Sequence, residues 1–260
     1  SLVVDPADAD EFLRSELALA AAKTAWACGE PGILFSPRPD QATAPCGEVF
    51  MQPYEVCMLG NINLAELCSE GGFDAARAYE AGRIAAQVLD ALVDCVRVPS
   101  PCMMEMVRLK RRIGVGVVGC ATALDCFDIR YGSEESLKAA HSMGATIERA
   151  TAEQCRGRNA STMACPPTGG TAGMLGVSLS IEPHRHNELL ATPEEHVRVL
   201  AAWQRHVDNG VSKTVTMPQS ATVEDVLAVW RLAWRLRCKG VTVYRDGCLS
   251  AECTAESCAL

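Results

Sequence analysis

Two cysteines and a carboxylate lie close together in the segment 44–64, and together they could carry out chemistry. Glu48 follows Cys46 by two residues, and Cys57 comes later in the same segment. Because side chains alternate along an extended chain, Cys46 and Glu48 are expected to point to the same side, together with Ala44. A thiol next to a carboxylate can take part in hydrogen transfer, proton transfer or nucleophilic attack.

The residues around Cys46 favour a constrained loop that a ligand can approach closely. Pro45 restricts Ala44 to extended geometry, and Gly47 has no side chain to shield the backbone. Two other interpretations stay open from these residues alone. Cys46 could be a small buried hydrophobe, which is the usual role of a free cysteine. It could also be the nucleophile of an unrelated thiol enzyme, although the segment contains no histidine to act as its base.

A second candidate site is the loop of small and hydroxyl residues at 167–173. Its first five positions are Pro167, Thr168, Gly169, Gly170 and Thr171. Such residues expose backbone N–H groups, and in front of a helix they favour phosphate binding. No lysine follows, so the loop is not a Walker motif. From composition alone, an ordinary turn is the competing interpretation.

The glycines at 114–119 match the GxGxxG pattern of dinucleotide-binding folds, and Glu134 follows where an acid could bind ribose. That fold needs a buried apolar strand just before the glycines. The preceding residues 107–113 are instead rich in arginine and lysine, which disfavours a central parallel strand. We therefore interpret the glycines as sites of close packing between a strand and a helix.

Composition indicates a globular protein with an acidic surface. The 260 residues are 48% hydrophobic and 22% charged, and the formal net charge is −8. This balance argues against a broad nucleic-acid or anionic-membrane surface. The first residues are acidic and do not form a signal peptide, and no run is long enough to span a membrane. We expect a cytoplasmic protein.

Cysteine is unusually frequent, with 14 residues. No CxxC pair occurs and the histidines lack zinc-site spacing, so we expect no structural metal site and mostly reduced, buried thiols. The exception is the C-terminal tail, where Cys248, Cys253 and Cys258 are regularly spaced and could form a redox tail or a plain disordered end.

Periodicity predicts helices alternating with short apolar strands, which indicates an α/β fold. Helices are expected at 9–28, at 73–95 with Ile84, Val88 and Leu92 on one stripe, near 119–127, and from the Ser133 cap to about 156. Thr192 and Thr222 open two more helices, the first carrying Val207 and the second ending at Gly240. Strands are expected at 33–35, 113–118, 211–216 and 241–244.

Several segments, taken in order, resemble ribonucleotide reductases, most closely the adenosylcobalamin-dependent class. In chain order they are GEPGILF at 29–35, PCGE at 45–48, EVCMLGNINLAEL from 55, RRIGVGVVG at 111–119, PTGGTAG at 167–173, IEP at 181–183, VDNGVSKT at 207–214 and KGVTVYRDG at 239–247. The resemblance implies part of the family's ten-stranded α/β barrel, with the loop 44–64 threading its centre. It covers only the C-terminal portion of the family: a leading helix at 1–31, the barrel part at 32–247, and the cysteine-containing tail at 248–260.

The resemblance also implies roles for single residues. Cys46 matches the cysteine that becomes a thiyl radical, Glu48 the carboxylate that takes the 3′-hydroxyl proton, and Cys57 one of two reducing cysteines. Ala44, Pro45, Gly47 and the loop Pro167, Thr168, Gly169, Gly170 and Thr171 match substrate-binding positions. Ala44 departs from the family, which has asparagine there, and a lost hydrogen-bond partner typically costs about 1–3 kcal/mol.

The cofactor and partners follow from the same resemblance. Reductases with a separate radical subunit carry two adjacent tyrosines near the C-terminus, whereas here Tyr244 is followed by Arg245. This favours adenosylcobalamin as the cofactor. The implied partners are a ribonucleotide substrate, a thioredoxin-like reductant, and either an N-terminal reductase half or a second copy of the chain. The alternative is a degenerate, non-catalytic paralogue that binds a nucleotide or a reductase partner.

Overall fold

The computed structural model describes residues 1–38, 42–69 and 72–248, in which helices and strands alternate along most of the chain. The strands are β1 (Leu2–Val4), β2 (Ile33–Phe35), β3 (Ala42–Thr43), β4 (Phe50–Met51), β5 (Met58–Asn63), β6 (Cys68–Ser69), β7 (Gly72–Phe73), β8 (Ile113–Val118), β9 (Thr214–Met217) and β10 (Gly240–Arg245). The helices are α1 (Ala9–Phe12), α2 (Glu16–Cys28), α3 (Ala75–Cys95), α4 (Pro101–Lys110), α5 (Cys120–Asp125), α6 (Glu134–Cys155), α7 (Gly169–Leu175), α8 (Pro193–Gln204) and α9 (Val223–Arg235), with 3-10 turns η1 (Ala65–Leu67) and η2 (Arg185–Leu190).

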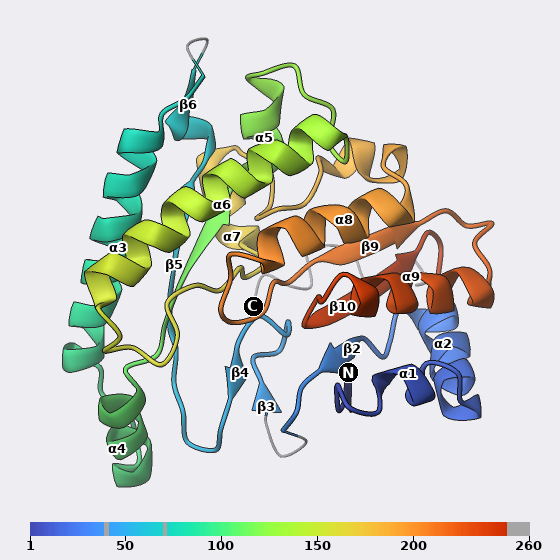
Figure 1. Cartoon of the computed structure of the whole chain (residues 1–260), viewed down its shortest axis with the longest axis horizontal. Coiled ribbons are helices and arrows are strands. Elements are labelled where there is room, and N and C mark those ends of the chain that lie inside the picture. Colours follow the sequence, from blue (N-terminus) through green and yellow to red (C-terminus); the bar gives the residue numbers. More distant parts are fainter. Residues whose placement is uncertain (39–41, 70–71, 249–260) are drawn as a thin grey trace.

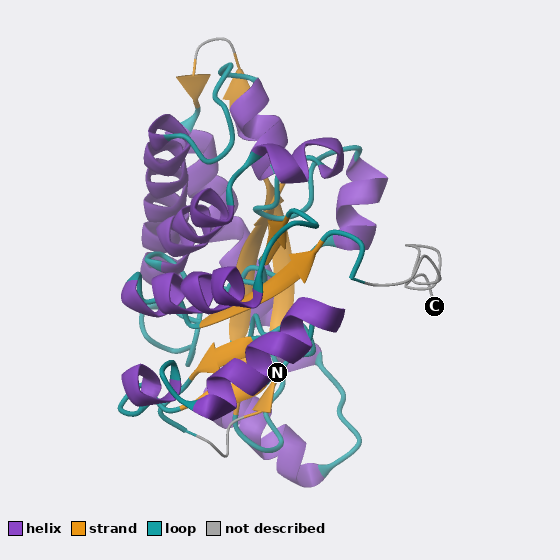
Figure 2. Cartoon of the chain, turned by 90° about the vertical axis from the view of Figure 1, so that its right-hand side faces the viewer, coloured by secondary structure: helices purple, strands orange, loops and turns teal. Residues whose placement is uncertain are grey.

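Mostly parallel strands form the centre of the molecule, and helices flank them (Figures 1 and 2). β5 pairs in parallel with β8, and β8 is bridged to the segment around Met163. That segment is bridged in turn at Cys165 to Val211, just before β9. β9 pairs in parallel with β10, β10 antiparallel with β2, and β2 in parallel with β1. The strands therefore form one continuous wall, running from β5 to β1.

The outer helices follow the same order as the strands they cover. α3 packs on β5 and on α6, α6 packs on α8, and α8 packs on β9 and α9. α2 then contacts both α9 and β10. The single large core lies between the two layers and includes the fully buried Trp203 of α8 and Trp230 of α9. A strand wall covered outside by helices confirms the predicted α/β class.

The glycines of β8 lie inside a strand, so the dinucleotide-loop interpretation fails for this chain, as the sequence indicated. A Cβ atom on Gly116 would lie 2.5 Å from the backbone oxygen of Ala164 and 2.6 Å from Oδ1 of Asn61. Close packing is therefore confirmed. Its partners, however, are the neighbouring strand and the segment after Met163 rather than a helix.

The N-terminal prediction of one helix at 9–28 is wrong in one respect, since that segment forms two helices, and an unpredicted strand precedes it. The chain first forms β1, which adds a strand to the wall beside β2. It then forms two helices, because the Ser15 hydroxyl accepts a hydrogen bond from the amide N–H of Ala18 and caps a new helix. A side-chain cap of this kind satisfies one of the free N–H groups at a helix start and so fixes where α2 begins.

The apolar stripe of α3 faces outward. Ile84, Val88 and Leu92 are 46%, 51% and 47% exposed, whereas small residues such as Gly82 face the neighbouring helix. A Cβ atom on Gly82 would lie 2.9 Å from Cβ of Ala150 on α6. The close approach of α3 and α6 therefore places Gly82 and its small neighbours Ala78 and Ala86 in the buried face, which also holds Leu89 and Val93, and leaves the stripe of Ile84, Val88 and Leu92 outside.

Most of the predicted helix starts are confirmed by their caps. Ser133 accepts a hydrogen bond from the amide N–H of Ser136, and Thr192 and Thr222 both form complete capping boxes. The predicted helix ends are less accurate. α8 stops before Val207, which the sequence predicts to lie on it, and α9 ends at Arg235 rather than at Gly240, which begins β10. α4 is a helix that is not predicted from the sequence, since proline usually interrupts a helix. Pro101 instead occupies the first turn of α4, where proline is tolerated.

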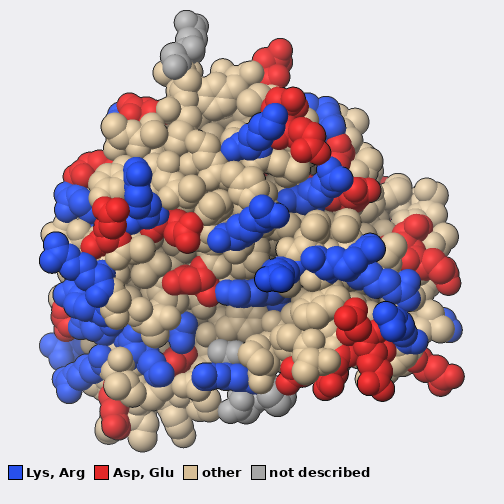
Figure 3. Space-filling view, viewed as in Figure 1, with Lys and Arg blue, Asp and Glu red and all other residues tan. Residues whose placement is uncertain are grey.

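Acidic and basic side chains are interspersed on the face shown in Figure 3. Such a mixed surface is typical of a globular protein with modest net charge. Among the described residues, no helix combines the length and apolarity needed to cross a bilayer.

Candidate active site

A tight turn, and not an extended strand, carries Cys46 and Glu48. β3 and β4 form a small hairpin, and within it the amide N–H of Gly47 donates to the carbonyl of Ala44 at 2.9 Å. Pro45 occupies the second position of this turn and Gly47 has a φ of 76°, a conformation that favours glycine. The expectation that Ala44, Cys46 and Glu48 share one side of an extended segment is therefore wrong. Pro45 and Gly47 instead bend the chain so that Cys46 lies at the tip.

The turn separates the two reactive groups by exposure. Cys46 is exposed at the tip, whereas Glu48 is only 6% exposed. The Oε2 atom of Glu48 is buried and has no hydrogen-bond partner among the described residues. A buried carboxylate oxygen without a partner is costly, and such atoms in native structures often belong to residues with a catalytic role. Burial also raises the pKa of Glu48 above its usual value.

Gly210 holds the turn against the strand wall. Its amide N–H donates to the carbonyl of Glu48 at 2.8 Å. A Cβ atom on this residue would lie only 2.4 Å from the backbone oxygen of Gly47, so no larger residue fits. The carbonyl of Gly210 in turn accepts from the amide of Cys165, at the start of the segment leading to the loop 167–171. One backbone segment therefore ties the cysteine turn to the candidate phosphate loop.

Cys57 precedes β5 and lies within electrostatic reach of Glu48. Burial, against the opposing charge of Arg112 and with a smaller contribution from nearby carboxylates that include Glu48, raises the pKa of the Cys57 thiol to about 12. Burial also raises the pKa of Cys46, and Glu48 again adds to the rise. Both thiols are free. The Glu48 carboxylate therefore lies near enough to both cysteines to raise the pKa of each thiol.

The loop 167–171 lies at the start of α7. Thr168 has a positive φ of 61° and is buried, and its hydroxyl accepts a hydrogen bond from the amide N–H of Ser180 at 2.8 Å. Gly169 and Gly170 are exposed, and a Cβ atom on either would meet no other atom within 4 Å. The glycines therefore face open space, while Thr168 anchors the loop.

Sequence reasoning assigned no role to three charged or polar residues around Cys57. Arg112 forms an ion pair with Glu55, and its Nη1 donates to Oδ1 of Asn209 at 3.5 Å. Asn209 is 3% exposed, and its Nδ2 has no partner among the described residues. Arg112 and Asn209 lie inside RRIGVGVVG and VDNGVSKT, so the resemblance marked their segments without indicating their role.

The structure describes one of the three tail candidates. Cys248 is half-buried, and its amide N–H donates to the carbonyl of Arg245. Cys253 and Cys258 lie outside the described residues.

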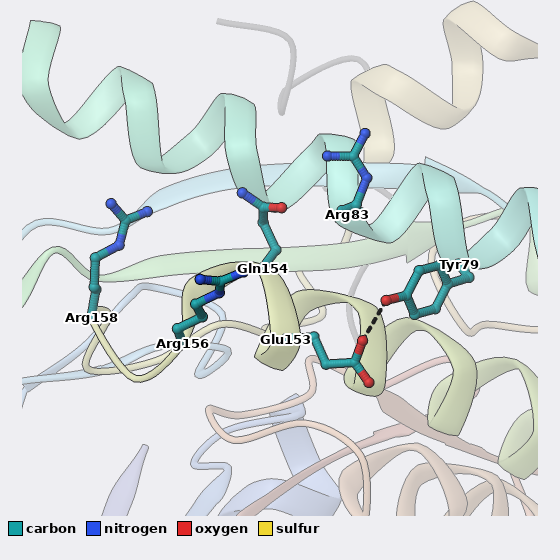
Figure 4. A pocket seen from close by; sticks show the side chains of 6 residues that line it. All are labelled: Tyr79, Arg83, Glu153, Gln154, Arg156 and Arg158. Atoms are coloured by element: carbon teal, nitrogen blue, oxygen red, sulfur yellow. Dashed lines mark hydrogen bonds between the residues drawn. The ribbon is translucent and has the colours of Figure 1, made fainter.

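A separate hollow of about 530 Å³ lies on the outer helices (Figure 4). It is lined by Tyr79, Arg83, Glu153, Gln154, Arg156 and Arg158. Much of its charge is already paired, since Arg83 binds Glu80 at 2.6 Å and Arg158 binds Asp90 at 2.6 Å. Because its lining comes from α3 and from the end of α6, it is not part of the cysteine site.

Sequence comparison decides the family. The family described as "Ribonucleotide reductase, barrel domain" matches residues 9–156 and 188–244, well over half of the chain. The chain belongs to the ribonucleotide reductase barrel family. This membership confirms the predicted barrel type.

The chain is also similar in sequence to curated ribonucleotide reductases. The vitamin B12-dependent ribonucleoside-diphosphate reductase of Mycobacterium tuberculosis is 33% identical over 90% of this chain and 47% of its own length. The enzyme of the same name from Thermoplasma acidophilum is 29% identical over 85% of this chain and 41% of its own length. The chain thus spans about half the length of the curated relatives it matches.

Solved structures of reductases share the fold. A B12-dependent class II ribonucleotide reductase superposes with a TM-score of 0.74 at 16% identity, covering 96% of this chain and 47% of the other. The class Id reductase α subunit of Actinobacillus ureae gives a TM-score of 0.77 at 16% identity, covering 94% and 64%. At this identity, the structural likeness concerns the fold alone.

Proposed function

We propose that this chain is the C-terminal catalytic part of an adenosylcobalamin-dependent ribonucleotide reductase, which reduces ribonucleotides to deoxyribonucleotides by thiyl-radical chemistry. The observation that carries the proposal is the position of Glu48. Its buried carboxylate acts electrostatically on both Cys46 and Cys57 and keeps one oxygen without a partner among the described residues. The printed names of the relatives, vitamin B12-dependent reductases, support the same reaction.

Each residue of the turn has a distinct proposed role. Cys46, exposed at the tip, removes the hydrogen atom from the ribose 3′ carbon. Glu48 takes the proton of the 3′ hydroxyl, and burial makes its carboxylate a stronger base by raising its pKa. Cys57 supplies reducing equivalents to the 2′ position, and it ends in a disulfide with a second cysteine.

The exposed tip of the turn suits an initiator that binds next to it, because the side chain of Cys46 is accessible. Adenosylcobalamin supplies the initiating radical when it is bound. Arg245 supports a local initiator as well: its guanidinium lies 4.1 Å from the ring centre of Trp26 and donates to the carbonyl of that residue. The position after Tyr244 therefore holds an arginine fixed onto α2, and a second relay tyrosine is absent there.

The loop 167–171 is proposed to hold the substrate phosphates. Replacing Gly169 with valine should weaken nucleotide binding at least ten-fold, about 1.4 kcal/mol, because the new side chain fills the open space in front of α7. The fold should stay intact, since no atom lies within 4 Å of the added Cβ and glycine is a poor helix former. Calorimetric titration with a ribonucleotide measures the affinity.

Met174, which is 90% exposed near the end of α7, offers a matched control. Met174→Gln should leave both the affinity and the circular dichroism spectrum unchanged. If Gly169→Val bound nucleotide as tightly as the parent, the phosphate site would have to lie elsewhere.

Partners are proposed to complete the barrel and to renew the thiols. Among the described strands, β5 and β1 end the wall without pairing to each other. Open sheet edges and the exposed stripe of α3 favour association with a protein that covers them, and we propose an N-terminal reductase half or a second copy of the chain. A thioredoxin-like dithiol would re-reduce Cys57, and Cys248, Cys253 and Cys258 are proposed shuttles. Reduced thiols fit a cytoplasmic location.

The chain alone should not turn over ribonucleotides. The reduction needs a second cysteine facing the same ribose carbon, which the resemblance places in an N-terminal half, and Ala44 lacks an amide to hold the substrate. The test incubates the purified chain with adenosylcobalamin, a dithiol and each ribonucleotide, and measures deoxyribonucleotide.

Three outcomes bear on the proposed function. Activity that appears only with an added N-terminal half, and that rises with Ala44→Asn, supports it. Multiple turnovers by the chain alone would contradict the need for a partner, and inactivity of the completed assembly would contradict the proposed reaction.

A further inference from the structure

A buried ion pair lies directly beside Cys57. The guanidinium of Arg112 contacts the carboxylate of Glu55 with Nη2–Oε2 at 3.1 Å and Nε–Oε2 at 3.2 Å. The two side chains are only 12% and 1% exposed. A buried pair contributes little net stability, because removing both charges from water offsets their attraction. Its location next to a thiol therefore points to a role in setting the reactivity of that thiol.

Strand register places Arg112 alongside Cys57. Met58 on β5 is the register partner of Ile113 on β8, and the amide N–H of Met58 donates to the carbonyl of Arg112 at 3.2 Å. Cys57 and Arg112 are the residues immediately before these two parallel strands, so they lie next to each other. Glu55, two residues before Cys57, fixes the guanidinium in this position through a two-pronged contact.

The other charged groups that act on Cys57 are all acidic. Asp208, Glu48 and Glu55 each raise the pKa of Cys57, and burial raises it most of all. The carboxylate of Asp208 accepts hydrogen bonds from the amide N–H groups of Thr162 and Met163, at 2.7 and 2.8 Å. These two bonds hold the carboxylate in place. Arg112 is the cation that lowers the pKa of Cys57 among the described residues.

We propose that Arg112, held by Glu55, is a positioning residue that keeps the Cys57 thiol able to form a thiolate in a buried and otherwise acidic site. The need arises when the disulfide of Cys57 is reduced. The thiolate of a dithiol reductant attacks the other sulfur, a new S–S bond forms, and the old bond breaks. Cys57 leaves with the electron pair as a thiolate, which takes a proton from water. A guanidinium next to the sulfur stabilises that leaving thiolate.

This inference rests on the proposed function for the use of Cys57, but its test does not need turnover. The rate of alkylation by iodoacetamide is measured at single cysteines by mass spectrometry between pH 7 and pH 10. Since a shift of one pKa unit changes the thiolate fraction about ten-fold, Arg112→Gln should slow alkylation of Cys57 roughly ten-fold at pH 8. Arg112→Lys should restore most of the rate.

Cys46 is the internal standard in the same samples. Burial and Glu48 raise the pKa of Cys46, and Arg112 is not among the groups that act on it, so its rate should stay constant. Arg111 offers a matched control, because its guanidinium binds Asp90 and Asp94 on α3 instead. Arg111→Gln should leave the alkylation rate of Cys57 unchanged.

Glu55→Gln distinguishes an electrostatic role of Arg112 from a structural one. It breaks the same ion pair as Arg112→Gln, but it removes a negative charge near Cys57 instead of a positive one. The electrostatic role predicts that Glu55→Gln keeps or raises the rate at Cys57, whereas a purely structural role predicts the same loss as Arg112→Gln. If Arg112→Gln does not fold, the double variant with Glu55→Gln leaves no unpaired buried charge, and it should still alkylate more slowly than Glu55→Gln alone.

Equal rates at Cys57 with and without Arg112, or equal slowing by both single variants, would overturn the inference. An inactive assembly that keeps the expected alkylation contrast would instead contradict the proposed function alone.

Discussion

Replacing Cys46 with serine is expected to abolish cobalamin-dependent hydrogen exchange in the completed assembly, whereas replacing Cys57 with serine should leave part of it. The hydroxyl of serine has a much stronger bond to hydrogen than a thiol has, so it cannot supply the radical at the turn tip. In the proposed reaction Cys57 acts later, in the reduction of the 2′ position, so exchange at the radical step should not require it. Tritium release from labelled cofactor or substrate measures the exchange.

The exposure of Cys46 makes this comparison a clean one. The side chain lies at the tip of the turn and is not part of the buried core, so Cys46→Ser should keep the thermal unfolding temperature of the parent. Full exchange by Cys46→Ser would show that another thiol starts the reaction, and complete loss in Cys57→Ser would remove the division of roles between the two cysteines.

Replacing Lys213 with methionine is expected to destabilise the fold strongly. Lys213 is completely buried, and its ammonium group donates to the carboxylate of Glu182, to Nδ1 of His196 at 2.8 Å and to the carbonyl of Thr214 at 2.9 Å. Burial, together with the nearby Lys213 charge, lowers the pKa of His196 to about 3, so this ring stays neutral and accepts the hydrogen bond.

Removing one partner of such a buried cluster typically costs about 3–5 kcal/mol, because a buried charge is left unpaired. That is a large share of the roughly 5–15 kcal/mol by which domains of this kind are stable. Urea unfolding measures the loss. The exposed Lys138 on α6 is the matched control, and Lys138→Met should change the free energy of unfolding by less than about 0.5 kcal/mol.

A double variant distinguishes charge from packing at the same position. Lys213→Met together with Glu182→Gln removes both charges, so it should recover part of the stability lost in the single variant. If the double variant were as unstable as the sum of the two single variants, the two side chains would not be coupled and the prediction would be wrong.

The cluster also bears on the site, because Glu182 lies two residues after Ser180. The amide of Ser180 donates to the Thr168 hydroxyl and so anchors the loop 167–171. The carboxylate of Glu182 accepts from the amide N–H of Thr214 at 2.8 Å, which joins this segment to β9. Loss of the cluster should therefore loosen the candidate phosphate loop as well as the fold.

Local features of the chain could be predicted from sequence because short-range interactions decide them. The Thr192 and Thr222 capping boxes begin their helices where expected, since a hydroxyl and a carboxylate three residues apart satisfy the free N–H groups whatever lies around them. The apolar run of β8 is a buried strand for a similar reason. The motif order, read through family resemblance, also singled out Cys46, Glu48 and Cys57, whose roles stay a prediction.

Short-range reasoning gave the wrong answer where two local signals competed. Alternation along the chain predicted an extended Cys46 segment, but Pro45 and Gly47 together favour a turn, and the pairing of β3 with β4 stabilises it. On α3, Ile84, Val88 and Leu92 do share one stripe, but that stripe is exposed. The buried face holds the small residues Ala78, Gly82 and Ala86, which let α6 approach closely, together with Leu89 and Val93.

The sequence by itself thus determined the fold class and most helix starts, since these depend on neighbouring residues and on motifs. The reacting groups that it indicates stay a proposal. Only the tertiary structure decided which distant charges meet. Glu55 pairs with Arg112 across two strands, and Lys213 with Glu182 across two loops, at separations where no periodicity or spacing rule applies. The physical reason is that such pairs form only when the strand wall brings them together and excludes water, so their partners follow from the packing of the whole chain.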